Sequence, residues 1–163
     1  MNGTRCALDG CSFRYASDES ADGVERGVHA IDHVSLQARA GEVVMLVGRS
    51  GCGKTTVTRL LNGLAPEYFR GSLHGEARVG GLHAGVAAVE DYATEVGSVF
   101  QNPKTQYFHA NSTDELAFPC ENAGMEPSEI RRRIRERLRA FDVEHLHDRN
   151  IVDCSGGQQQ QLA

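Results

Sequence analysis

The spacing of apolar residues changes along the chain, predicting strands first and helices later. Residues 34–38 alternate apolar and polar side chains, which is typical of a half-buried antiparallel strand. Residues 43–47 are continuously apolar and mostly β-branched, as in a strand buried on both faces of a parallel sheet. Shorter strand-like pieces lie at 12–15, 77–79 and 96–100, and polar turns are predicted at 17–27 and 40–42.

Helical spacing begins near residue 55 and returns beyond residue 111. Apolar residues between 57 and 64 recur at the period of a helix, and Pro66 would stop it. Residues 112–115 form a capping box that predicts a short helix beginning at Ser112. A longer helix is predicted at 128–141, with a charged face exposed to solvent. Its buried stripe would consist of Ile130, Ile134, Leu138 and Phe141.

The composition fits one globular domain with an ordinary core. The chain has 163 residues, of which 40% are hydrophobic and 24% charged. Its formal net charge of −5 argues against a nucleic-acid partner, because phosphate backbones attract basic surfaces. The longest aliphatic run, 43–47, is far shorter than the ~20 residues of a membrane span. The amino terminus lacks the pattern of a secretory signal, so export is not expected.

The cysteines predict free thiols rather than a disulfide framework. Their number is odd and their spacing scattered, which favours a reducing compartment. Cys6 and Cys11 could form half of a zinc site, but no second Cys/His pair stands at a matching spacing.

A glycine-rich segment between a predicted strand and a predicted helix has the pattern of a phosphate-binding loop. Residues 48–55 read Gly-Arg-Ser-Gly-Cys-Gly-Lys-Thr and match G-x-x-x-x-G-K-[ST]. The glycines let backbone N–H groups wrap an anion, and the following helix adds its positive end. Lys54 would reach the β- and γ-phosphates, and the Thr55 hydroxyl would ligate Mg²⁺. Alone, the pattern leaves kinases, GTPases, helicases and transporter ATPases open, with ATP or GTP as ligand.

Two further features change this picture only in combination with the loop. Gln101 ends a strand-like piece before a turn, where an amide can contact Mg²⁺ or its water. Residues 155–158, Ser-Gly-Gly-Gln, form a second glycine loop before a helix. Taken singly, the first is an ordinary strand end and the second an ordinary helix-capping turn.

With all three features in this order, the sequence resembles the ATP-binding subunits of ATP-binding-cassette (ABC) transporters. The loop at 48–55 matches the Walker A motif of that family, Gln101 its Q-loop and residues 155–158 its signature. The details look most like the ATPase subunits of energy-coupling-factor importers of cobalt, nickel or vitamins. That likeness rests on residues 61–64 and 100–103, on Gln106 and Phe108, and on 115–118 with Glu121 and Asn122.

The resemblance implies an α/β fold of the P-loop NTPase class. An antiparallel amino-terminal β part and an incomplete parallel core sheet with the Walker A loop would occupy residues 1–102. A helical subdomain would follow at 103–154. The signature loop and the start of the next helix would occupy 155–163.

The resemblance also implies roles for individual residues around MgATP. Tyr15 would stack on adenine, Lys54 and Gln101 would serve catalysis, and Thr55 and Gln101 would attend Mg²⁺. The loop residues expected to hold the nucleotide are Gly48, Ser50, Gly51, Cys52, Gly53, Lys54, Thr55 and Thr56. The signature residues expected at a partner's ATP are Ser155, Gly156, Gly157 and Gln158.

Partners and location follow from the same resemblance. Two such chains would pair head to tail and act on a transmembrane transporter subunit, with import of a metal ion or vitamin. The protein would then be cytoplasmic and peripheral on the inner face of the cell membrane. A non-catalytic nucleotide-binding or assembly module, and a soluble ABC protein of repair or translation, are the alternative functions.

The match has gaps that bear on activity. The Walker B strand, the D-loop and the switch histidine of the family have no counterpart in these 163 residues. We therefore expect this chain alone to bind ATP without hydrolysing it at a useful rate. Without the missing strands, residues 43–47 would expose an unpaired edge or an apolar face. Cys154 stands where the family usually has Leu.

Overall fold

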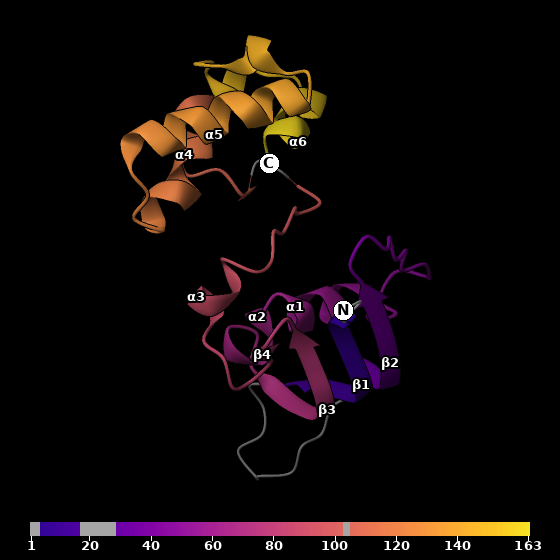
Figure 1. Ribbon diagram of the computed structural model, residues 1–163. Coiled ribbons are helices and arrows are strands. Elements are labelled where there is room, and N and C mark those ends of the chain that lie inside the picture. The colour runs from indigo at the N-terminus through magenta and orange to yellow at the C-terminus, as the bar shows by residue number, and fades with distance from the viewer. Residues whose placement is uncertain (1–3, 17–28, 103–104) are drawn as a thin grey trace. The chain divides into compact units, whose positions relative to one another are not determined.

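The computed structural model describes residues 4–16, 29–102 and 105–163 (Figure 1). They belong to two compact units, Met1–Ser98 and Val99–Ala163, which are described separately below. The turn predicted at 17–27 lies outside the described residues.

The first unit is built around a four-stranded antiparallel sheet. Its strands are β1 (Thr4–Tyr15), β2 (Ile31–Arg39), β3 (Gly71–Val79) and β4 (Leu82–His83). The order is β2-β1-β3-β4, so the long strand β1 lies between β2 and β3 (Figure 1). The antiparallel strand predicted at 34–38 is confirmed within β2. The strand-like pieces at 12–15 and 77–79 are confirmed in β1 and β3, and the turn at 40–42 is also present.

Short helices complete this unit and cover one side of its core. α1 (Lys54–Leu61) is followed by α2 (Leu64–Glu67) and α3 (Val89–Tyr92). Val57 and Leu60 of α1 pack into a buried cluster with Leu8, Cys11, Phe13, Ile31, Ala65 and Ala77. The helix predicted to run up to Pro66 ends earlier, because Asn62 caps α1 and Pro66 lies inside α2.

The strand predicted at 43–47 is not formed in the structure. These residues pair with no strand among those described, and Val43 and Val47 are 95% and 79% exposed. A parallel strand is stable only when neighbouring strands cover its edges and layers cover its faces. The described sheet is antiparallel throughout, so it holds no parallel strand beside which residues 43–47 could be buried. The expectation of an exposed apolar segment is therefore confirmed, and the expectation of a formed strand is wrong. The piece at 96–100 is likewise not a strand.

The second unit is helical. It contains α4 (Ser112–Asn122), α5 (Pro127–Ala140), the 3₁₀ turns η2 (Glu144–Leu146) and η3 (Ile151–Asp153), and α6 (Gly156–Leu162). Ile130, Ile134 and Leu138 form the buried stripe of α5, as predicted. The prediction that Phe141 belongs to that stripe is wrong, because Phe141 caps the helix end and is 63% exposed.

Helix α4 begins at Ser112 as predicted, but the residue that caps it differs from the predicted one. The N-cap is Asn111, whose side chain accepts a hydrogen bond from the Thr113 amide at 2.7 Å. Ser112 is fully buried, and its hydroxyl donates to the Leu146 carbonyl and accepts from the Arg149 amide. Because this second contact holds Ser112 inside the unit, the capping role moves one residue back.

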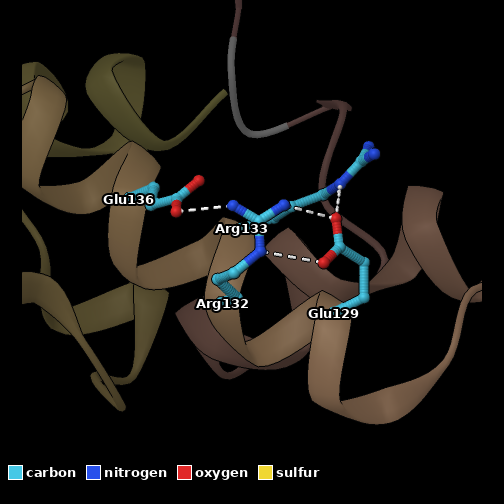
Figure 2. A network of polar contacts seen from close by, with 4 residues as sticks. All are labelled: Glu129, Arg132, Arg133 and Glu136. Carbon is cyan, nitrogen blue, oxygen red and sulfur yellow. Dashed lines mark hydrogen bonds and ion pairs between the residues drawn. The ribbon is translucent and has the colours of Figure 1, made fainter.

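The exposed face of α5 carries a network of charges. Glu129 accepts hydrogen bonds from Arg132 and Arg133, and Arg132 also donates to Glu136 (Figure 2). The two guanidinium groups hold the pKa of Glu129 at about 2, well below its usual 4.5. The network lies on exposed side chains, which agrees with the predicted charged face of this helix.

Candidate functional site

The loop at 48–53 leads from the exposed apolar segment into α1. Gly53 is the N-cap of α1 and has a φ of 92°, and Gly51 has a φ of 81°. Both values lie in the left-handed region that favours glycine. A Cβ at Gly53 would collide with the Ala30 carbonyl and with the Ile31 side chain. The loop therefore lies close to the start of β2, and only glycine fits at its last position.

Lys54 folds back over this loop. Its ammonium donates hydrogen bonds to the carbonyls of Gly48 (2.9 Å) and Arg49 (2.8 Å), and it lies 3.6 Å from the Cys52 Sγ. A Cβ at Gly48 would come within 2.6 Å of the same sulfur, so the loop is tightly closed at this point. The positive charge of Lys54 therefore lies against the carbonyls of the loop itself.

The first turn of α1 has backbone donors that no side chain caps. Gly53 provides no side-chain acceptor, and the first turn contains no acidic residue. Helix N-termini of this kind attract anions through their free N–H groups and the helix dipole. Together with Lys54, the chemistry of the donors fits a phosphate chain.

The two threonines after Lys54 lie in different environments. Thr55 is exposed in the first turn of α1, where its hydroxyl is available to a metal ion at the phosphates. Magnesium takes few protein ligands and completes its shell with water and phosphate oxygens, so one hydroxyl fits it. Thr56 is 4% exposed, and its hydroxyl lies 3.0 Å from the Tyr15 hydroxyl.

Tyr15 ends β1 on the side of the sheet that α1 covers. Its ring lies edge-on to Phe13, and its hydroxyl accepts a hydrogen bond from Arg59 at 3.1 Å. The family resemblance singled out Tyr15 but not Arg59. An arginine inside an amphipathic helix carries no signal that separates it from a solvated one.

The other predicted site residues belong to the second unit. Gln101 is exposed and lies outside any helix or strand. Its proximity to Lys54 stays a prediction, and so does the approach of residues 155–158 to a nucleotide.

Residues 155–158 begin α6 with a capping box. The Ser155 hydroxyl accepts from the Gln158 amide at 3.3 Å, and the Gln158 side chain accepts from the Ser155 amide at 2.9 Å. Gly156 and Gly157 have open space where a Cβ would stand. Within the unit, this loop therefore serves as an ordinary helix start.

Gln159 anchors α6, and the sequence reasoning missed it. Gln159 is 5% exposed, and its side-chain amide donates to the Ile151 carbonyl at 2.9 Å. The main-chain carbonyl of Gln159 accepts from the Tyr107 hydroxyl. A glutamine within a run of four glutamines has no distinguishing pattern, so only packing reveals this role.

No helix within the described residues combines the length and the apolar character that crossing a bilayer requires. No cluster of three or more His, Cys, Asp or Glu side chains arranged for a metal ion occurs in that part of the chain either. All five cysteines are free thiols.

Comparison with known proteins gives consistent matches. The model of the family described as "ABC transporter" matches residues 31–163. The chain is 37% identical over 156 residues to a protein of Treponema denticola described provisionally as an ABC transporter ATP-binding protein. This alignment covers 96% of the chain and 30% of that protein. A similarly described protein of Pyrococcus horikoshii is 36% identical over 156 residues, covering 96% of the chain and 52% of that protein. The chain therefore spans about half or less of the length of these relatives.

Two solved structures share the fold. One is cbiO1 of Clostridium perfringens, described as part of the ABC transporter complex cbiONQ, with a TM-score of 0.78 and 23% identity. That match covers 99% of this chain and 59% of cbiO1. The other is the ATP-binding cassette MJ0796 bound to ADP and Pi, with a TM-score of 0.74 and 22% identity. It covers 96% of this chain and 66% of that one.

Proposed function

This chain belongs to the ABC transporter family, and we propose that it binds MgATP and couples ATP hydrolysis to transport in the protein of which it forms part. The observation that carries the proposal is the loop at 48–53, with two left-handed glycines, an uncapped helix start and Lys54 folded over it. These features place uncapped backbone donors and a positive charge at one loop, where ATP would replace the two loop carbonyls as the partner of Lys54.

In this proposal, Lys54 and the backbone N–H groups from Gly51 to Thr56 hold the phosphates. Thr55 contributes a hydroxyl to the magnesium ion, which supplies charge neutralisation at the phosphates. Tyr15 offers its ring to adenine. Gln101 would contact the magnesium ion or its water.

A partner chain supplies the remaining contacts. The signature residues Ser155, Gly156, Gly157 and Gln158 would approach the γ-phosphate of ATP bound to a second ABC ATPase chain, head to tail. In its bond to the Gln158 amide at 3.3 Å the Ser155 oxygen accepts, so the hydroxyl hydrogen remains to donate to a phosphate oxygen. The open space at Gly156 and Gly157 supports close approach of a partner's nucleotide.

The transporter type is proposed from sequence details and from the cbiO1 likeness. Residues 61–64, 100–103 and 115–118 are typical of energy-coupling-factor importers, which take up metal ions or vitamins. The partner would then be a small transmembrane subunit, with this protein peripheral on the cytoplasmic face of the membrane.

The 163 residues by themselves are expected to bind without turnover. No run of four or more apolar residues in them leads into an Asp-Glu pair, so they contain no Walker B general base. A missing general base typically lowers a rate by about 10²–10⁴-fold.

The decisive experiment is calorimetric titration of MgATP into the purified chain. Lys54→Ala should weaken binding by about 10- to 100-fold, because hydrogen bonds to charged groups contribute about 1.5–3 kcal/mol. Arg131→Ala is the matched control, because Arg131 lies exposed on α5 in the other unit. Equal affinities in the wild type and Lys54→Ala would contradict the proposal. Phosphate release at rates typical of the family, abolished by Lys54→Ala, would contradict the expected inactivity alone.

A further inference from the structure

The guanidinium group of Arg59, on the helix that follows the phosphate loop, lies over two aromatic rings. Its guanidinium carbon lies 3.6 Å from the ring centroid of Phe69 and 5.9 Å from that of Tyr15. No carboxylate forms an ion pair with Arg59 within the described residues. Its positive charge is therefore held by aromatic faces, which fixes the planar group in one orientation.

Hydrogen bonds connect Arg59 through Tyr15 to Thr56 in the first turn of α1. A guanidinium can only donate, so the Tyr15 oxygen accepts from Arg59, and the Tyr15 hydrogen remains for the Thr56 hydroxyl 3.0 Å away. Thr56 is buried two residues after Lys54, so it moves with the first turn of α1. The chain of contacts thus runs from β1 to the helix that follows the phosphate loop.

We propose that Arg59 is a positioning residue for the nucleotide base. It orients the Tyr15 ring as a platform and, through the Tyr15 hydroxyl and Thr56, fixes the distance between that platform and the phosphate loop. The inference rests on the proposed function, because it assumes a base against Tyr15 and phosphates at Lys54. Tyr15 is half-buried, so part of its ring remains accessible.

If Arg59 positions the base, replacing it should weaken binding only of ligands that contain a base. We would measure binding of MgATP and of magnesium tripolyphosphate, which has the phosphates without the nucleoside. Arg59→Met keeps a long apolar stem and removes the charge. It should weaken MgATP binding by about 2- to 10-fold, as expected for one net hydrogen bond, and leave tripolyphosphate binding unchanged. Arg59→Lys should recover part of the loss, because it restores a donor but not the planar fork.

Arg5→Met is the matched control, because Arg5 is exposed at the other end of β1. Equal weakening of both ligands by Arg59→Met would overturn the inference, because a merely structural role would distort the loop as a whole. Unchanged affinity for both ligands would also overturn it. If the wild type binds neither ligand, the proposed function itself fails, which is a distinguishable outcome.

The hydroxyl link can be tested separately. Tyr15→Phe keeps the ring and removes the bridge to Thr56, and Thr56→Val removes the other partner at nearly constant volume. Each should weaken MgATP binding, and the double variant should bind MgATP no more weakly than the weaker-binding single variant. Additive losses would show that Tyr15 and Thr56 act independently and would overturn the link.

Discussion

The two glycine-containing helix starts, at 48–55 and at 155–158, differ in whether side chains cap their backbone N–H groups. α1 begins at a left-handed glycine without any side-chain cap, and Lys54 bends back over the loop. α6 begins at Ser155, which forms a reciprocal capping box with Gln158. Glycine is sterically required at Gly53, whereas open space surrounds Gly156 and Gly157.

The difference lies in which backbone donors a side chain already satisfies. In the first loop, no side chain caps the N–H groups at the start of α1, and an anion there would draw Lys54 away from the carbonyls of Gly48 and Arg49. In the second loop, the amides of Ser155 and Gln158 are each satisfied by the other residue's side chain. The start of α6 is therefore stabilised by its own side chains, whereas the start of α1 is not.

The largest predicted effect is a difference in stability between alanine substitutions at a glycine of each loop. Gly53→Ala should lower the free energy of unfolding by about 2–4 kcal/mol, because a left-handed φ and a collision with the Ala30 carbonyl add together. Gly157→Ala should leave it unchanged or raise it by up to about 1 kcal/mol, because alanine stabilises a helix. Urea unfolding followed by circular dichroism measures both. Similar destabilisation by both variants would remove the distinction between the loops.

The next effect concerns the two loop serines. Ser155→Ala should cost about 1 kcal/mol, since it removes the N-cap of α6. Ser50→Ala should change stability by less than about 0.5 kcal/mol, because Ser50 is exposed in the turn before α1. The same unfolding measurement on both variants makes the comparison. A cost at Ser50 as large as that at Ser155 would mean that the first loop also depends on a side-chain cap.

The spacing of apolar residues predicted those elements that need to be covered on one face only. The alternation in β2 and the helical stripe of α5 were predictable, because each needs only one covered face. The segment 43–47 was not, because a strand buried on both faces depends on neighbours that the described sheet does not offer. Asn111 and Ser112 are both good caps, and only the burial of Ser112 decides between them.

The site divides in the same way. The loop from Gly48 to Thr55 could be predicted because its function lies in the backbone, and few residues permit that backbone. Arg59 could not, because its position between Tyr15 and Phe69 depends on how β1 and the segment before β3 pack on α1. The roles of Gln101 and Ser155 toward a nucleotide stay predictions, because the geometry of the second unit by itself does not test them.

The smallest effect comes from a third helix start, that of α5, which is stabilised by charge. Glu129 in its first turn is held by Arg132 and Arg133 (Figure 2), and its pKa is about 2 against the usual 4.5. A lowered folded-state pKa contributes stability above pH 4.5 that is lost as the pH falls toward 2. Glu129→Gln should therefore lower the melting temperature slightly at neutral pH and flatten its dependence between pH 4.5 and 2. The effect should be smaller than that of Ser155→Ala, because exposed ion pairs are screened by water and salt. Parallel melting curves of wild type and variant across this range would show that the arginine contacts contribute nothing to the helix start.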